Sequence, residues 1–135
     1  MSKINLGIIG GGQLGSMLSV AAKKLNIKTT IFCDDINAPA QNFCDEFISG
    51  DYNDNKKILE FVKKVNVITY EFENIPYETL NEMNKLVSVL PKPSVNRLIQ
   101  HRLAEKDFIN KLNIRTTRYV SIEKKTDLDT LEDFL

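Results

Sequence analysis

The sequence predicts an α/β fold, a Rossmann-like parallel sheet flanked by helices. Short apolar runs, typical of strands buried on both faces, alternate with segments whose apolar residues recur at helical spacing. A glycine-rich turn at residues 10–15 joins the first apolar run to the first helical segment. The 135 residues suit one such domain, and a chain of this length buries about two-thirds of its unfolded surface in a core.

The glycine-rich turn lies between a predicted strand at residues 4–9 and a predicted helix at residues 14–25. Gly10, Gly12 and Gly15 stand at the G-x-G-x-x-G spacing. The first glycine of this pattern permits a tight turn, the second lets backbone approach a phosphate, and the third lets the helix pack close to the strand. Free N–H groups at the helix start attract anions. The turn therefore predicts a phosphorylated ligand, although a turn that serves only packing shows the same pattern.

The first helix and second strand complete a β-α-β unit. The helix is predicted from apolar residues at helical spacing, with Asn26 as its C-terminal stop: Leu14, Met17, Leu18, Ala21, Ala22 and Leu25. Residues 28–33 are β-branched and aromatic, which favours a strand. Asp34 and Asp35 follow it, about 20 residues beyond the glycines, where dinucleotide enzymes hold a ribose hydroxyl. The two acids suit the start of a polar loop equally well.

The middle of the chain predicts two more strands and three more helices. A short helix at 41–45 and a strand at 47–49 are followed by a turn at 51–54 with N-cap character, a helix at 55–65 and a strand at 67–70. Glu71 and Glu73 come directly after that strand, at the edge of a parallel sheet where ligands bind. In extended backbone their side chains point to one side. They are expected to accept hydrogen bonds from ribose hydroxyls or an amine; the alternative is two solvated residues before a helix at 77–86.

The last third of the chain predicts mixed elements. They are a strand at 87–90, a helix at 95–99 capped by Ser94, a helix at 102–112 ended at Asn113, a strand at 119–122 and a last helix with Thr126 as its N-cap. In the helix at 102–112, Leu103, Phe108, Ile109 and Leu112 are expected to face inward. The last helix has an apolar face and no later element to pack on, so the chain looks cut before further domains.

Charge and cysteine content narrow the possible partners. Lys plus Arg and Asp plus Glu both number 18, so no nucleic-acid or membrane partner is expected. Cys33 and Cys44 lack metal-binding spacing and are expected to be reduced and half-buried, and His101 has no neighbours for a metal or triad role. With no signal peptide and no membrane-spanning run, the cytoplasm is the expected location. Arg102 and Lys106 are four residues apart, a pair suited to phosphate or to a solvated surface.

Several motifs in order resemble one family. They are residues 10–15 followed by Met17, Pro39-Ala40-Gln41, Thr69-Tyr70-Glu71-Phe72-Glu73-Asn74, and Arg102 with Glu105-Lys106. Together they resemble the N-terminal part of the 5-(carboxyamino)imidazole ribonucleotide synthetases, ATP-grasp ligases of purine biosynthesis. The resemblance implies a pre-ATP-grasp domain over residues 1–113 and an incomplete start of the ATP-grasp region over 114–135.

The same resemblance implies a function and its site residues. Such enzymes use ATP, Mg²⁺ and bicarbonate to carboxylate 5-aminoimidazole ribonucleotide, and a full-length member is expected to be a homodimer. Gly12, Gln13, Leu14 and Glu73 would bind this substrate and Arg102 would contact ATP. The nucleotide-gripping lysine, the glycine-rich lid and the acidic magnesium ligands would lie beyond the chain. The 135-residue chain is therefore expected to supply no catalytic residue and no metal ligand, and to be inactive by itself.

Two departures and two rival interpretations stand beside this resemblance. Ser16 replaces the family's usual arginine, and Asp35 replaces its usual proline, which bears on substrate affinity and not on the fold. The glycines and Asp34 also fit a nicotinamide-dependent dehydrogenase domain. The second rival interpretation is a non-catalytic remnant or interaction module.

Overall fold

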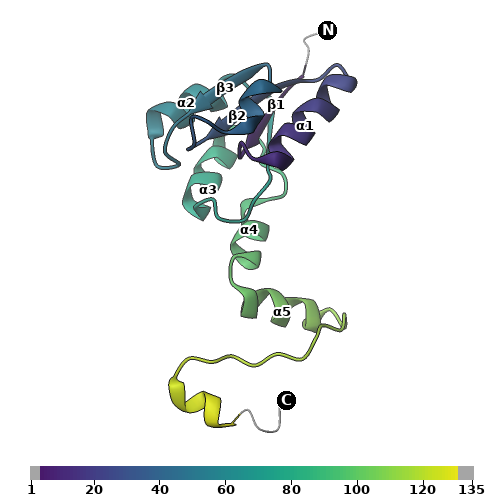
Figure 1. Ribbon diagram of the computed structural model, residues 1–135, viewed down its shortest axis with the longest axis vertical. Helices are drawn as coiled ribbons and strands as arrows, with labels where there is room; N and C mark the ends of the chain where they lie inside the picture. The colour runs from purple at the N-terminus through teal and green to yellow at the C-terminus, as the bar shows by residue number, and fades with distance from the viewer. Residues whose placement is uncertain (1–3, 131–135) are drawn as a thin grey trace. The chain divides into compact units, whose positions relative to one another are not determined.

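The computed structural model describes residues 4–130, which form two compact units that divide after residue 100. The first unit is an α/β sheet domain with helices on both sides of the sheet (Figure 1). The second is a small helical unit. The expected domain boundary after residue 113 stays a prediction.

The sheet has the predicted parallel arrangement. Its strands are β1 (Asn5–Ile9), β2 (Lys28–Cys33), β3 (Glu46–Ser49) and β4 (Val67–Tyr70), in the order β3-β2-β1-β4. Ile9 at the end of β1 pairs with Phe32 of β2 and with Tyr70 of β4. The segments that leave these three strands therefore begin side by side at one edge of the sheet.

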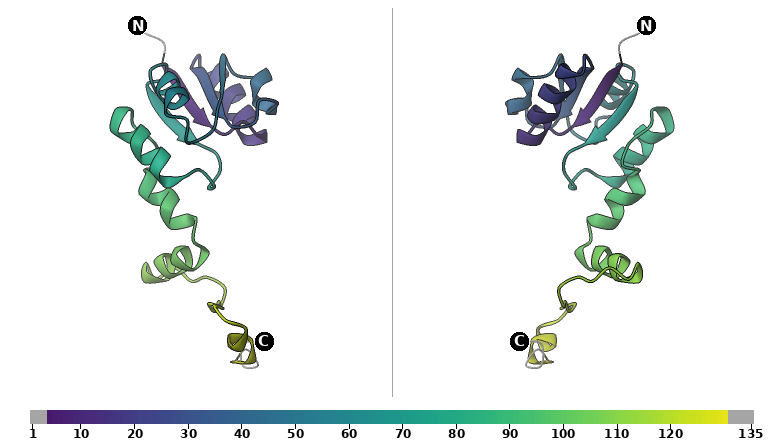
Figure 2. Two further views of the ribbon diagram at one scale, coloured as in Figure 1. Left: turned by 90° about the vertical axis from the view of Figure 1, so that its left-hand side faces the viewer. Right: turned by 90° about the vertical axis from the view of Figure 1, so that its right-hand side faces the viewer.

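Helices lie on both sides of the sheet (Figure 2), and buried apolar residues form a core on each of its faces. The helices of this unit are α1 (Gln13–Lys24), α2 (Asn55–Val62), α3 (Tyr77–Leu86) and α4 (Pro93–Ile99), with a 3₁₀ turn η1 at Pro39–Asn42. On one face Ile9, Phe32 and Ile68 pack with residues of α2 and α3. On the other, Ile8 and Ile31 pack with Ala38 and Ala40 around η1, and α1 lies against β1, β2 and η1.

Helix α1 buries its small residues. Gly15, Ser19 and Ala22 face the sheet, whereas Leu14, Met17 and Leu25 are more than half exposed. Small side chains allow the helix to approach the strands closely, which leaves the apolar residues that predicted the helix largely on its outer side.

Several predicted boundaries are confirmed. Asp54 caps α2, since its Oδ1 accepts hydrogen bonds from the amides of Lys56 (2.9 Å) and Lys57 (3.2 Å). Asn26 and Asn113 each follow a helix with positive φ, 57° and 61°, the left-handed conformation that ends helices.

Other expectations for the first unit were wrong. The helix at 41–45 is instead η1, which begins two residues earlier because Pro39 suits a first helical position. The strand at 87–90 is reduced to one bridge between Ile68 and Val89, since the chain reaches Pro91, which cannot donate to a ladder. Helix α4 begins at Pro93 after Lys92 with no side-chain cap, so Ser94 is not its cap.

The second unit contains α5 (Arg102–Lys111) and a 3₁₀ turn η2 (Lys125–Thr130). The predicted strand at 119–122 is absent from this described part, because the unit supplies no partner strand. No residue of α5 is fully buried: of the residues expected to face inward, Leu103 and Ile109 are half-buried, whereas Phe108 and Leu112 are exposed, so the expectation was wrong for these two. Thr126 lies inside η2 and not before it; the rest of the predicted last helix, residues 131–135, lies outside the described residues. Within residues 4–130, no helix has both the length and the apolar character needed to cross a membrane.

Candidate functional site

The glycine turn lies where β1 ends and α1 begins. Gly10 has φ +111°, a conformation that side chains rarely tolerate, and its amide donates to the Phe32 carbonyl oxygen at 2.9 Å. A Cβ added at Gly15 would lie 2.5 Å from the Gly10 carbonyl oxygen. The predicted roles of the first and third glycines, a tight turn and close packing, are confirmed.

The start of α1 offers unpaired backbone donors to a ligand. Gly12 is the N-cap residue and makes no side-chain cap, and the first amides of a helix have no partner inside it. Gln13 and Leu14 carry the next amides, and their side chains are exposed. This is the segment that the sequence assigned to substrate binding.

Glu71 closes over the glycine turn. Its Oε1 accepts a hydrogen bond from the Gly12 amide at 3.3 Å, and its Cγ lies 2.5 Å from where a Gly10 Cβ would be. Its own amide donates to the Ile9 carbonyl oxygen at 3.2 Å. One donor of the turn is thus used internally, and a carboxylate stands where the sequence predicted an anionic ligand.

Glu73 lies in a segment of bent backbone. The chain bends at residues 71, 73 and 75, so the condition for Glu71 and Glu73 to point to one side, extended backbone, is not met. Glu73 is exposed, unlike Glu71, which is half-buried against the turn. The two carboxylates therefore have different surroundings.

Two amide side chains, one in α4 and one in the residue that follows it, hold this segment, and the sequence reasoning missed both. Gln100, which follows α4, donates from Nε2 to the carbonyl oxygens of Glu73 (2.6 Å) and Ile75 (2.7 Å). Asn96 is fully buried and donates from Nδ2 to the Ile75 carbonyl oxygen at 3.2 Å. The feature of the sequence that could have revealed them is their spacing of four residues, one helical turn, which places both side chains on one face of a short helix.

The acids after β2 have local roles. Asp35 accepts a hydrogen bond from the Asn37 amide at 2.8 Å, as the start of a polar loop does. Asp34 is exposed and accepts from the Cys33 thiol at 3.7 Å. Cys33 and Cys44 are free thiols: Cys44 is half-buried as predicted, whereas Cys33 is more deeply buried than predicted. Burial raises the pKa of both thiols above the ordinary value, with the Asp34 carboxylate adding to the effect at Cys33.

Arg102 and Lys106 take different partners in the second unit. Arg102 Nη1 lies 2.6 Å from Glu105 Oε2 with its side chain 81% exposed. Lys106 Nζ donates to Thr117 Oγ1 at 3.0 Å and lies over the Tyr119 ring. The role of Arg102 toward ATP stays a prediction.

His101 has a structural role at the start of α5. Its Nδ1 accepts from the Ala104 amide at 3.3 Å, which caps the helix. Across residues 4–130 no three or more His, Cys, Asp or Glu side chains gather as metal ligands.

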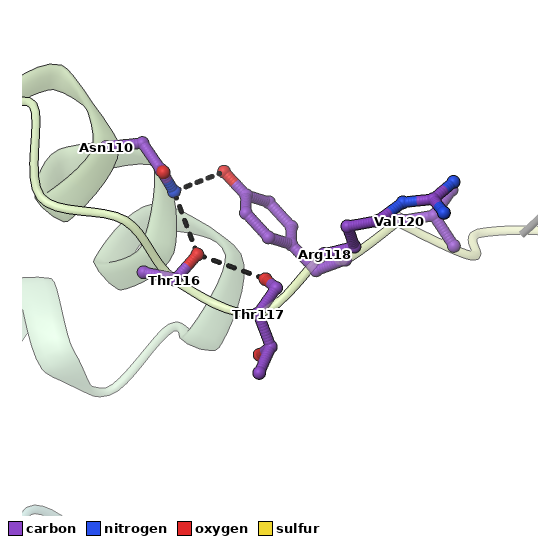
Figure 3. A pocket seen from close by; sticks show the side chains of 6 residues that line it. Asn110, Thr116, Thr117, Arg118 and Val120 are labelled. Atoms are coloured by element: carbon purple, nitrogen blue, oxygen red, sulfur yellow. Dashed lines mark hydrogen bonds between the residues drawn. The ribbon is translucent and has the colours of Figure 1, made fainter.

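Two surface hollows lie apart from the glycine turn. One, of about 520 Å³, is in the second unit, where Asn110 Nδ2 donates to Thr116 Oγ1 and to the Tyr119 hydroxyl (Figure 3). The other, of about 360 Å³, runs along the outer side of α1 beside Phe43. Neither contains Glu71 or Glu73.

The chain resembles curated proteins of purine synthesis. It is 40% identical over 123 residues to the bifunctional purine synthesis protein purC/E of Dictyostelium discoideum. The matched stretch covers 91% of this chain and 12% of that protein. It is 36% identical over 123 residues to the N5-carboxyaminoimidazole ribonucleotide synthase of Brucella melitensis, covering 91% of this chain and 34% of that protein. The chain thus spans 12% and 34% of the length of these two relatives.

Solved structures give the same result. The N5-carboxyaminoimidazole synthetase of Staphylococcus aureus complexed with ADP matches 98% of this chain and 36% of its own, with TM-score 0.89 and 32% identity. The N5-carboxyaminoimidazole synthase of Aspergillus clavatus in complex with ADP and 5-aminoimidazole ribonucleotide also matches 98% of this chain and 36% of its own, with TM-score 0.83 and 27% identity. The model of the ribonucleotide synthetase preATP-grasp domain matches residues 1–100. The chain therefore belongs to the ribonucleotide synthetase preATP-grasp domain family.

Proposed function

We propose that this chain is the N-terminal substrate-binding domain of a ligase that carboxylates 5-aminoimidazole ribonucleotide with ATP and bicarbonate. The observation that carries the proposal is the meeting of the glycine turn and the Glu71–Asn74 segment at one edge of the sheet, where Ile9 pairs with Tyr70. Ligands of open parallel sheets bind outside this edge. Relatives named N5-carboxyaminoimidazole ribonucleotide synthase support the choice of reaction.

Each proposed site residue has chemistry that fits the substrate. The open amides of Gln13 and Leu14 suit an oxygen acceptor of the ligand, and Gly12, whose own amide is held by Glu71, adds no side chain of its own beside them. The exposed Glu73 carboxylate suits donors, either ribose hydroxyls or the amine that receives the carboxyl group. The chain's part in the reaction would be to hold and orient that amine.

The ATP site is proposed to lie mainly outside this chain. Two solved relatives are complexes with ADP or ATP, and Arg102, which the family resemblance assigns to ATP, carries a guanidinium suited to a nucleotide phosphate. Mg²⁺ would accompany the nucleotide phosphates and is proposed to be held, like them, mainly outside this chain. A homodimer in the cytoplasm completes the proposal for a full-length protein.

The dehydrogenase alternative is less well supported by the geometry. In dinucleotide-binding turns the second glycine leaves room for a pyrophosphate. Here Glu71 Oε1 lies 3.2 Å from the position of a Gly12 Cβ, so a side chain of the protein occupies the space through which a pyrophosphate would approach Gly12. A non-catalytic remnant would bind none of these ligands.

The test is residue-resolved binding to the chain by amide NMR. Addition of 5-aminoimidazole ribonucleotide should shift the amide signals of Gln13, Leu14 and Glu73 saturably, and NAD should not. Replacement Glu73→Ala should weaken the binding by about tenfold, as loss of a charge-assisted hydrogen bond does. Saturable shifts with NAD alone, or no shifts with either ligand, would overturn the proposal.

The chain is also expected to be inactive by itself. No release of phosphate from ATP that depends on 5-aminoimidazole ribonucleotide should be measured with the purified chain. Such release would show that the ATP site does not lie mainly outside it.

A further inference from the structure

Glu71 is connected to the glycine turn at three points. Its amide donates to the Ile9 carbonyl oxygen at 3.2 Å, which continues the pairing of β4 with β1. Its Oε1 accepts from the Gly12 amide at 3.3 Å. Its Cγ, Cδ and Oε1 lie within 2.9 Å of the position of a Gly10 Cβ. The side chain therefore fills the space that the two glycines leave free.

This contact gives the first two glycines of the motif an internal use. A Cβ at Gly10 would overlap the Glu71 side chain, and a Cβ at Gly12 would crowd Oε1 at 3.2 Å. Glu71 thus excludes a side chain at Gly10 and leaves little room for one at Gly12. The amides of Gln13 and Leu14, beyond Gly12, are left for a ligand.

We propose that Glu71 is a positioning residue: it holds the Gly12 amide, and so sets the turn that presents the Gln13 and Leu14 amides to the ligand. It makes no contact with the ligand itself, in contrast to Glu73. The inference rests on the proposed function, because it concerns the same site.

The role depends on an acceptor oxygen, and this separates it from direct recognition of a ligand by charge. Glutamine keeps the length and an acceptor oxygen of glutamate but not its charge. Alanine removes both. A positioning role therefore tolerates Glu71→Gln, whereas a contact between a carboxylate and a ligand amine does not.

The experiment compares Glu71→Gln, Glu71→Ala and the control Asp54→Ala. Asp54 makes the same kind of bond, carboxylate to backbone amide, in the same unit but at the start of α2. Amide NMR titration with 5-aminoimidazole ribonucleotide should show binding weakened about tenfold in Glu71→Ala and within about threefold of the unchanged chain in Glu71→Gln and Asp54→Ala. Hydrogen exchange of the Gly12 amide should accelerate in Glu71→Ala only.

The outcomes separate the inference from the function on which it rests. Equal weakening by glutamine and alanine would assign Glu71 to direct contact and overturn the proposal, as would full affinity in Glu71→Ala. Equal weakening in Asp54→Ala would reduce the effect to general stability and overturn it too. If the unchanged chain binds no ligand, the proposed function fails, while exchange at Gly12 still decides whether Glu71 holds the turn.

Discussion

The side-chain amide of Gln100 donates hydrogen bonds to the backbone carbonyl oxygen of Glu73 at 2.6 Å and to that of Ile75 at 2.7 Å. A residue at the end of α4 thereby holds the backbone of the exposed glutamate that we propose binds substrate. The carbonyls after β4 are paired with a side chain and not with another strand.

Replacement Gln100→Ala should loosen the Glu73 backbone and weaken binding of 5-aminoimidazole ribonucleotide by about three- to tenfold, the effect of losing one or two hydrogen bonds. The measurement is the NMR titration described above. Asn42→Ala is the matched control, since Asn42 also donates from its amide to a backbone carbonyl, that of Pro39, and should leave affinity unchanged. Unchanged affinity in Gln100→Ala would remove this residue from the site.

Gly10→Ala should destabilise the chain by about 2 kcal/mol or more, because φ of +111° is strained for alanine and the added Cβ meets Glu71. Gly12→Ala should cost less, since φ there is −75° and the nearest atom is 3.2 Å away. Urea unfolding measures both free energies. Equal values would show that the turn does not depend on the conformation of Gly10.

Phe61→Ala should destabilise the first unit by about 3–5 kcal/mol, the usual cost of removing a buried aromatic ring. Phe61 is fully buried and stacks on Phe32 with ring centroids 5.5 Å apart. Leu59 lies in the same helix but is 45% exposed, so Leu59→Ala should cost about 1 kcal/mol or less. Thermal or urea unfolding of the two variants distinguishes the buried face of α2 from its outer face.

Tyr52 should make the chain less stable at alkaline pH. Burial, together with the nearby Cys33 and Asp34, raises the pKa of its hydroxyl above the ordinary 10.0. The unfolded chain then loses this proton near pH 10.0 while the folded chain keeps it, so the stability from this group is complete below that pH and falls above it.

Tyr52→Phe should flatten the loss of stability above pH 10.0. At neutral pH it should cost little, because the buried hydroxyl has no hydrogen-bond partner in the described structure. Cys33, whose ordinary pKa is 9.0 and is also raised, should still contribute a slope in the variant. Urea unfolding at a series of pH values tests this, and an unchanged slope above pH 10.0 would contradict it.

The local patterns predicted most of the sheet domain. The strands at 28–33 and 67–70 and the helix at 77–86 match β2, β4 and α3 in both bounds. The cap at Asp54 and the stops at Asn26 and Asn113 were also correct. These features depend on residues within one or two turns of each other, whose preferences are visible in sequence.

The predictions failed where an element needed a distant partner. The residue types at 119–122 favour a strand, but within the described part of this unit no second strand is available to pair with it. The apolar residues of α1 predicted the helix correctly, yet Gly15, Ser19 and Ala22 form its buried side. Close packing against a sheet selects small residues, and hydrophobic spacing alone does not reveal that choice.

By itself the sequence determined the order of the elements, the glycine turn, the placement of Glu71 and Glu73 after β4, and the resemblance to a family that the comparisons then showed. Only the tertiary structure decided the different surroundings of the two carboxylates. Glu71 reaches the turn across 59 positions of sequence, and Gln100 reaches the backbone of Glu73 across 27. Such contacts depend on how strands and helices are brought together in three dimensions. The two residues of each contact lie too far apart in the sequence for a local pattern to reveal the contact.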